Sequence, residues 1–365
     1  MRRAIVAAMA AAGAALASAA ALAADLPVKA PPTAVTAESG GFYVWVDGSY
    51  QSIHLPTFNL GPATNVGSFP PFGTGVYGSQ ILNLDPRVAG AGISGAVGYV
   101  LPPGSFWAFG SNFRIEFGAS YVHASGTTSG ALSYTLPAGA TTQLLNGNLV
   151  LSFGCVGICN SGSSLATTYD SWQFDLKAAG DFKSGLLTWT PSVAVFGGSS
   201  RDSQILSHLT NNGFSPTLNQ VYNANTRLEW NDVGARAGLG AKVDLTSAVA
   251  FGVSGFVGVA GRHTDLTGND QLTSGIFTNT STLAVAANKT AVVANAEARL
   301  TFRPMPRVTL MAFAGLNYDD SVPGIAAPSF VGPFTFAAPT IPAAIAYAKE
   351  TSYYAGGGLK VRFAP

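Results

Sequence analysis

The sequence is poor in charged residues. Only 10% of its 365 residues are Asp, Glu, Lys or Arg, and the formal net charge is +1. Nucleic-acid binding needs a pronounced basic excess, so we expect no nucleic acid partner. Soluble domains carry roughly a quarter of charged residues, so an ordinary water-exposed surface is also disfavoured.

Long hydrophobic runs are missing after the N-terminal stretch. A membrane-spanning helix needs about 20 apolar residues in a row. The nearest approach, AAPTIPAAIAYA at 337–348, is interrupted by prolines. Yet 47% of the chain is hydrophobic and 43 residues are glycine. An apolar chain without spanning helices leaves two classes, a secreted β protein or an outer-membrane barrel.

Cysteine and histidine are scarce as well. The two cysteines, Cys155 and Cys159, lie in FGCVGICNSG, and no histidine is near them. A zinc site needs about four such ligands, so we expect no metal and no cofactor. A small disulfide between Cys155 and Cys159 in an exposed loop is favoured over two free thiols if the chain is exported.

The N-terminus has the features of an export signal. In residues 1–23, two arginines precede an alanine-rich apolar stretch that ends in Ala-Leu-Ala, a small-x-small cleavage site. An uncleaved anchor is disfavoured because an acid and several prolines follow at once. Residues 24–40, ADLPVKAPPTAVTAESG, are proline-rich and predict a periplasmic linker. Residues 41–365 then form the folded part.

From residue 41 onward, hydrophobicity alternates with a period of two. In SNFRIEFGASY, Phe113 and Phe117 share one face of a strand, whereas Arg114 and Glu116 share the other. Ten segments alternate in this way, and they begin near Phe42, Val88, Ser111, Ser171, Leu187, Asp232, Val249, Ala291, Val308 and Tyr353.

Short and long connections alternate between these segments. The short ones are 102–105, 183–185, 246–248 and 304–307, and the long ones are 55–86, 125–169, 200–226, 264–288 and 320–348. Short periplasmic turns opposite long external loops are typical of bacterial outer-membrane barrels. We therefore predict an all-β fold, a transmembrane antiparallel up-and-down β-barrel of about 10 strands in the bacterial outer membrane.

Two other strand numbers compete with this prediction. The Asn-Gly signal in QLLNGNLVL (143–151) predicts a hairpin that either extends the sheet beyond the membrane or adds two strands, which gives about 12. A general porin of about 16 strands is disfavoured, because 264–288 and 320–348 lack clean alternation.

Aromatic residues lie near both ends of the predicted outward face, where a barrel meets the membrane interfaces. Those near the long connections are Tyr50, Tyr121, Trp172, Tyr318 and Tyr353. Those near the short connections are Phe42, Tyr99, Phe113, Phe182, Trp189, Phe251, Phe302 and Phe363.

The two ends of the chain resemble known barrels. Phe363, preceded by Val361 and Gly358, resembles the C-terminal signal read by the bacterial barrel-assembly machinery, although two residues follow it here. The leader with ADLPVKAPP and the strand GFYVWVDGSY resemble outer-membrane barrel proteins of alphaproteobacteria, a porin-like family of surface barrels. The resemblance implies outer-membrane lipid and the assembly machinery as partners and leaves a homo-oligomer open.

Charged residues of both signs fall on the predicted inward face. They are Asp47, Arg114, Glu116, Asp175, Lys177, Asp232, Arg236, Arg262, Glu297, Arg299, Lys360 and Arg362. These candidate pore-lining residues either line a narrow aqueous pore or form salt bridges that plug it, because unpaired buried charges are costly. Barrels of about eight strands are filled by their side chains, so about ten strands lie near the filled end.

Other motifs carry less weight. GAGISG at 90–95 has the glycine spacing of a dinucleotide fingerprint, but a strand follows it instead of a helix, so these inward glycines are expected to make room inside a narrow barrel. RHTD at 262–265 is a candidate rim hydrolase, but no Gly-x-Ser-x-Gly elbow accompanies it. We expect no enzyme, and a passive pore for small hydrophilic solutes, an envelope structural protein, or both. The alternative is adhesion through the loops.

Overall fold

A computed structural model describes residues 40–67, 75–102, 112–136, 140–146, 149–154, 157–211, 220–274, 277–326 and 344–363. Contacts divide the chain into residues 1–38 and 39–365, and everything described below belongs to the second unit. The predicted signal peptide, most of the predicted linker and Cys155 of the candidate disulfide lie outside the described residues. In the described ranges, no helix has the length and hydrophobicity that a membrane crossing requires.

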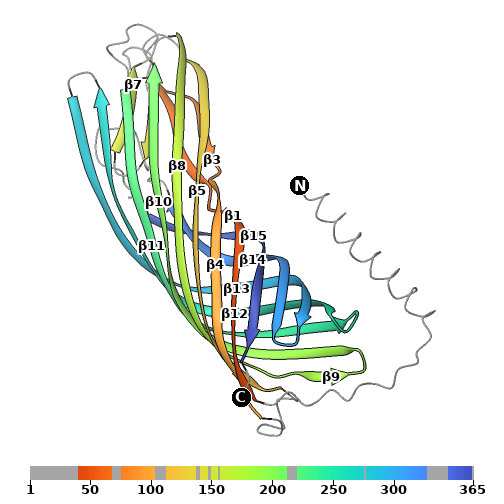
Figure 1. Cartoon of the computed structure of the whole chain (residues 1–365). Helices are drawn as coiled ribbons and strands as arrows, with labels where there is room; N and C mark the ends of the chain where they lie inside the picture. Colours follow the sequence, from red (N-terminus) through yellow and green to blue (C-terminus); the bar gives the residue numbers. More distant parts are fainter. Residues whose placement is uncertain are drawn as a thin grey trace. The chain divides into compact units, whose positions relative to one another are not determined.

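Ten antiparallel strands form a closed ring (Figure 1). In ring order they are β1 (Gly41–His54), β4 (Arg87–Val100), β5 (Arg114–Leu136), β8 (Gly157–Ala179), β10 (Leu187–Asn211), β11 (Gln220–Asp244), β12 (Val249–Ser274), β13 (Phe277–Met305), β14 (Val308–Ala326) and β15 (Ala344–Arg362). The last strand closes the ring by pairing with the first, for example Leu359 with Val46. The predicted all-β barrel of ten strands is confirmed.

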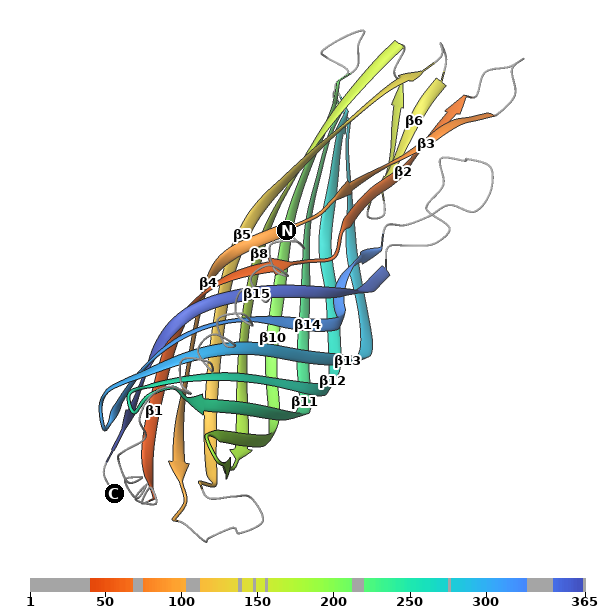
Figure 2. The same cartoon turned by 90° about the vertical axis from the view of Figure 1, so that its right-hand side faces the viewer.

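Five further strands lie outside the ring. The short β9 (Phe182–Ser184) pairs with the start of β10. A separate sheet has the order β3-β2-β6-β7, with bounds β2 (Phe58–Gly67), β3 (Gly75–Leu84), β6 (Ala140–Asn146) and β7 (Leu149–Gly154) (Figure 2). The predicted Asn-Gly hairpin joins β6 to β7, where Asn146 pairs with Leu149. Because this hairpin belongs to the separate sheet, the alternative of a twelve-stranded barrel is not realised.

Several connections differ from the prediction. Most of 125–169, 200–226 and 264–288 is strand and not loop, because the pairs β5–β8, β10–β11 and β12–β13 continue far beyond the apolar band. In these extensions the outer face is rich in polar residues and the inner face carries buried apolar ones such as Leu206, Leu228 and Leu266, so the apolar outer face that marks a strand in lipid is absent there. The predicted short turn at 102–105 is also wrong, because β4 ends at Val100 and β5 begins at Arg114. The tight turn at Gly185, whose φ is 62°, agrees with the prediction.

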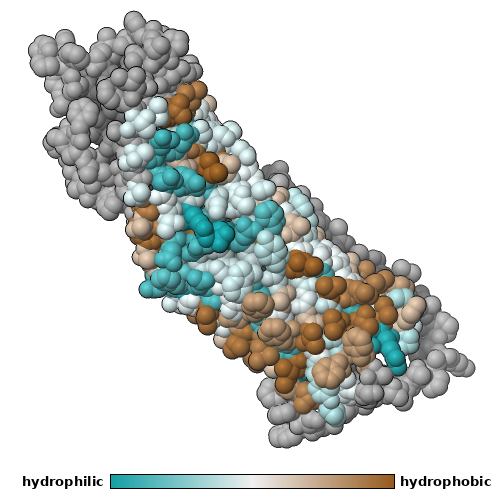
Figure 3. Space-filling view, turned by 60° about the vertical axis from the view of Figure 1, so that its left-hand side comes forward, coloured by the Kyte–Doolittle hydropathy of each residue, from teal (hydrophilic) through white to brown (hydrophobic). Residues whose placement is uncertain are grey.

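The outward face of the ring is the apolar one. Phe117 and Leu176 point outward and are 55% and 50% exposed. Figure 3 shows hydrophobic side chains gathered mainly in the lower half of one such face, with hydrophilic ones above. The predicted interface aromatics that are exposed include Tyr50, Tyr121, Trp172 and Tyr353 toward the extensions and Phe42, Tyr99, Phe182, Trp189, Phe302 and Phe363 toward the short turns.

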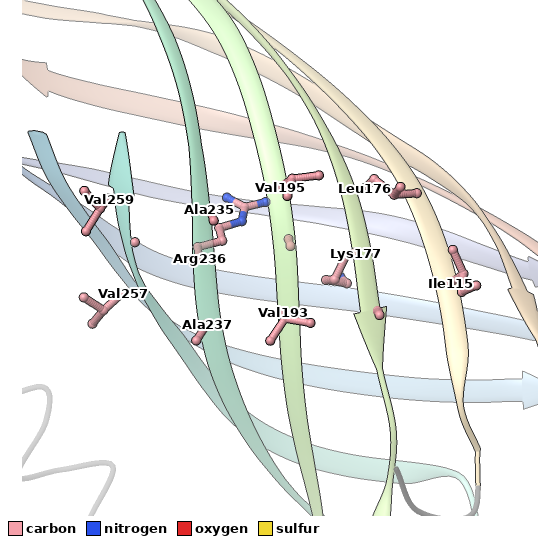
Figure 4. Close-up of a pocket in the computed structure, with 13 residues that line it drawn as sticks. Ile115, Leu176, Lys177, Val193, Val195, Ala235, Arg236, Ala237, Val257 and Val259 are labelled. Atoms are coloured by element: carbon pink, nitrogen blue, oxygen red, sulfur yellow. The ribbon is translucent and has the colours of Figure 1, made fainter. Parts of the chain in front are cut away.

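A shallow apolar hollow lies on this outward face (Figure 4). Ala235 and Ala237 of β11 form its floor, because their side chains are shorter than those of the flanking strands. Its walls are Val193 and Val195 of β10 and Val257 and Val259 of β12. Such a surface suits flexible acyl chains, which fill uneven apolar relief without needing polar partners.

Glycines on the inner face make room for large neighbours, as predicted for a narrow barrel. Gly98 of β4 lies directly opposite Tyr43 of β1, and a β-carbon at Gly98 would overlap the Tyr43 ring. Gly48 faces outward, and its nearest neighbour would be 4.0 Å away.

We expect Gly98→Ala to lower the free energy of unfolding by about 1–3 kcal/mol, because the Tyr43 ring must move out of its packed position. Gly48→Ala serves as the matched control and is expected to change it by less than about 0.5 kcal/mol. Chemical unfolding in detergent micelles measures both. Equal costs for the two variants would show that the inner face is not tightly packed at Gly98.

Candidate functional site on the inner face

All twelve charged residues predicted to face inward have their side chains on the inner side of the ring. Asp47, Glu116 and Arg262 are buried, and the other nine are partly buried. The alternation of the strands explains this placement, since every second side chain points away from the apolar outer face. These residues either line an open pore or form salt bridges that plug it, and the contacts of each one help to distinguish the two.

Glu116 of β5 is surrounded by three donors. Lys177 of β8 lies directly across from it and forms an ion pair. Two side chains of β1 reach the same carboxylate: the Tyr43 hydroxyl donates at 2.8 Å and the Trp45 Nε1 at 3.1 Å. Because β1 and β5 are separated by β4, this cluster connects strands that are not neighbours.

A second pair also bridges over a strand. Arg236 of β11 donates to Asp175 of β8 at 2.5 Å, and β10 lies between the two strands. The Arg236 guanidinium also lies 4.4 Å from the ring centre of Phe256 and 5.5 Å from that of Phe196. Charge pairing and cation–π contact therefore hold Arg236 in one position.

Arg262 of β12 has two acidic partners on the inner face, and we call this group the Arg262 cluster. Its Nε and Nη2 donate to the two oxygens of Asp232 at 2.8 and 2.7 Å. Its Nη1 and Nη2 donate to Asp319 at 3.2 and 2.7 Å, and Nη1 also reaches the carbonyl of Ser321 at 2.5 Å. The Arg262 side chain is only 1% exposed. Two bidentate pairs on one buried guanidinium fix β14 to β11 and β12.

Three further polar contacts lie near β13 and β1. Arg299 donates to Glu297 at 2.8 Å. The other oxygen of Glu297 accepts from the Tyr354 hydroxyl at 3.1 Å, which connects β13 to β15. Asp47 accepts a hydrogen bond from Ser94 across the β1–β4 pair.

The remaining charges lie toward the short-turn end. Arg114 pairs with Asp181 at 3.0 Å. The Lys360 ammonium lies 3.7 Å from the ring centre of Tyr43. Arg362 is partly buried at the end of β15. The Arg114 and Asp181 side chains are 21% and 20% exposed, whereas the Lys177 and Arg299 side chains are 31% and 32% exposed.

Two clusters of apolar side chains lie on the inner face above these charges. One cluster contains Ile53, Leu55, Val88, Ala124 and Val322. A second contains Leu228, Trp230, Leu266 and Leu283, with Ile325 and Ile345 packed against it. Tyr169 of β8 packs against both clusters. We call these residues the apolar layer.

The apolar layer joins opposite sides of the ring because of an irregularity in β14. The register between β14 and β15 shifts between Asp319 and Val322. Residues 321–324 are all buried, so the alternation of inward and outward side chains stops there. A β-carbon at Gly324 would lie 2.7 Å from Pro56, which shows how closely this segment approaches the end of β1. β14 therefore turns inward above Asp319, and Val322 joins the cluster against which Tyr169, from a strand across the ring, is packed.

Each of the four histidines contacts a different residue. His54 packs against Tyr353, and His123 contacts Asp170 at 2.8 Å on the outer face. His263 contacts Asn288 at 2.8 Å and Asp265 of the RHTD motif at 3.4 Å. His208 is buried and contacts Ser163 at 2.6 Å, and burial lowers the pKa of His208 to about 4. In the described ranges, no three acidic, histidine or cysteine side chains gather as metal ligands would.

Sequence reasoning located the charges but not their partners. The alternation of side chains alone places Tyr43 and Trp45 on the inner face, so their position beside Glu116 could have been predicted. The roles of Asp319 and Tyr169 had no such signal, because each depends on contacts between strands that are distant around the ring. Gly358, Val361 and Phe363, the predicted assembly signal, lie in the last strand and at its end, with Phe363 53% exposed.

Comparisons with known proteins give only distant similarities. No protein-family model matches the chain, and no curated protein matches it. The outer membrane protease OmpT of Escherichia coli aligns over 90% of this chain and 100% of its own, with 9% identity and a TM-score of 0.43. A FadL homologue of Pseudomonas aeruginosa aligns over 88% and 90%, with 10% identity and a TM-score of 0.22. The toluene transporter TodX of P. putida aligns over 90% and 91%, with 8% identity and a TM-score of 0.19. Such values transfer no activity to this chain, and the resemblance to alphaproteobacterial barrels stays a prediction.

Proposed function

We propose that this protein is an integral outer-membrane barrel that is closed at rest and acts as a structural protein of the bacterial envelope. The apolar outward face with aromatic residues toward both ends supports insertion in a bilayer. The alanine-rich leader and the last strand support export and recognition by the barrel-assembly machinery. Lipid then surrounds the ring, and the polar extensions of the strands stand outside the cell.

The apolar layer is the observation that favours a closed barrel. A solute that crosses the ring must part Tyr169 from the cluster that contains Val322, and both side chains are held in a continuous packed region. The Arg262 cluster holds the inward end of β14 below this layer. We infer no enzymatic activity, because the acid–histidine pairs His123–Asp170 and His263–Asp265 lie on water-exposed side chains of different strands.

A narrow passive pore is the second candidate. Lys177 and Arg299 are each nearly one-third exposed, which supports water inside the ring below the apolar layer. This water-accessible region becomes a pore for small hydrophilic solutes only if the layer above it opens.

Conductance across a planar bilayer tests the closed state. We expect no stepwise current from the wild-type protein, and stepwise current from the double variant Tyr169→Ala, Val322→Ala, which removes side chains from both sides of the layer. Val195→Ala is the matched control, because it shortens a side chain on the outward face and is expected to stay silent. Regular current steps from the wild-type protein would overturn the closed state and favour the pore.

A further inference from the structure

Among the described residues, three neighbouring side chains of β8 and β10 on the inner face of the extensions each have a buried oxygen atom without a hydrogen-bond partner. The atoms are Thr167 Oγ1, Asp202 Oδ1 and Gln204 Oε1. Their residues are 3%, 1% and 3% exposed. Buried polar atoms in proteins are nearly always paired, so three unpaired acceptors in one place point to a ligand that they bind.

The strand register brings these residues together. Gln204 of β10 lies directly across from Thr167 of β8, and Asp202 precedes it on the same face. Gln204 Nε2 donates to the other Asp202 oxygen, Oδ2, at 2.7 Å, so the two side chains are held side by side. On the far side of Gln204 lies Thr226, and beyond it Gly268, where the Thr226 methyl group packs closely against the backbone. Asp202 lies across from Tyr169 and Leu228, and the buried Leu165, Leu206 and Leu266 lie at the next inward positions of the neighbouring strands.

The electrostatics of this group are unusual. Among the residues that the structure describes, no Lys, Arg or His forms an ion pair with Asp202. Arg262, on the same face of the extensions, is already paired with Asp232 and Asp319. Burial raises the pKa of Asp202 to about 7, and only the hydrogen bond from Gln204 opposes this. An ionised Asp202 therefore lacks the positive charge that a buried carboxylate needs.

We propose that Thr167, Asp202 and Gln204 bind a small monovalent cation, with Na⁺ as the probe, through their unpaired oxygen atoms. Carboxylate, amide carbonyl and hydroxyl oxygens are the ligands that hard cations prefer. One carboxylate balances one positive charge, whereas a divalent ion would leave excess charge among leucines. Water would satisfy the hydrogen bonds, and a proton would neutralise Asp202 below its raised pKa, so we expect the ion to bind above that pKa, where the carboxylate is charged. This site is independent of whether the ring conducts.

Thermal and chemical unfolding of the full chain in detergent tests the proposal. NaCl is compared with choline chloride at the same ionic strength, because choline is too large for the site. We expect the unfolding constant to fall about tenfold when Na⁺ reaches ten times its dissociation constant, since the ion binds the folded state alone. Choline chloride is expected to have no such effect.

Asp202→Asn removes the charge while keeping the shape, and it is expected to abolish the difference between the two salts. Asp265→Asn is the matched control, because Asp265 lies exposed on β12, and it should keep the difference. Broadening of the sodium NMR signal by the wild-type protein, and not by Asp202→Asn, gives a readout that does not depend on unfolding. Equal effects of both salts on the wild-type protein, or a sodium effect that survives in Asp202→Asn, would overturn the site.

Discussion

Arg262→Ala is expected to lower the free energy of unfolding by about 3–5 kcal/mol, the usual cost of removing one partner from a buried ion pair. The Arg262 guanidinium is almost fully buried and serves Asp232, Asp319 and the Ser321 carbonyl together. Its loss leaves two carboxylates without a cation and frees the inward end of β14. Unfolding of the protein by guanidinium chloride in detergent micelles, monitored by tryptophan fluorescence, measures the change in free energy.

Two controls separate charge from packing in this experiment. Arg299→Ala removes a guanidinium that is 32% exposed and paired on its own strand, so its cost should be about 1 kcal/mol or less. The triple variant Arg262→Met, Asp232→Asn, Asp319→Asn removes all three charges and should recover most of the loss, because buried ion pairs are replaceable by neutral groups. If Arg262→Ala costs no more than Arg299→Ala, the Arg262 cluster does not stabilise the ring.

Leu176→Arg is the second variant with a large expected effect. Leu176 lies on the outward face of β8 between Trp172 and Phe182, so it is placed near the middle of the apolar band. An arginine on the lipid face at mid-bilayer costs about 2–4 kcal/mol. We expect this loss in the free energy of unfolding measured in phospholipid vesicles.

The matched variant for Leu176→Arg is Gln173→Arg on the same strand. Gln173 is partly buried on the inner face, beside other polar groups, so its replacement should cost about 1 kcal/mol or less. The ratio of the two costs reports which face meets hydrocarbon. A larger cost at Gln173 than at Leu176 would contradict insertion of this ring in a bilayer.

Much of the ring was predictable from the sequence, because lipid and water impose opposite demands on alternate residues. Phe117 and Leu176 face outward, and Glu116 and Lys177 face inward, as their parity predicts. The ten segments with this contrast became the ten strands of the ring. The predicted short connections at 183–185, 246–248 and 304–307 agree with the strand ends, whereas the one at 102–105 does not.

The parts that were not predictable are those where this contrast is lost. The extensions of β12 and β13 carry polar residues on their outer face, so their alternation gives no signal although their backbones pair fully. The inward end of β14 follows a shift in register, and no local pattern announces such a shift. The contact of Tyr169 with the apolar layer joins residues that are far apart in sequence. The pattern of a single sequence carries no information about such long-range contacts.

The seam between β1 and β15 also has a kinetic consequence. Arg362 pairs with Tyr43 and Phe363 donates to Phe42, so the final strand must find the first one across almost the whole folded part. Contacts between such distant positions form slowly, since the entropy of the intervening chain must be overcome first. Until then the partly assembled sheet has two unpaired edge strands, which are prone to aggregation. We therefore expect assembly to need a helper protein that shields both sheet edges until the last strand arrives.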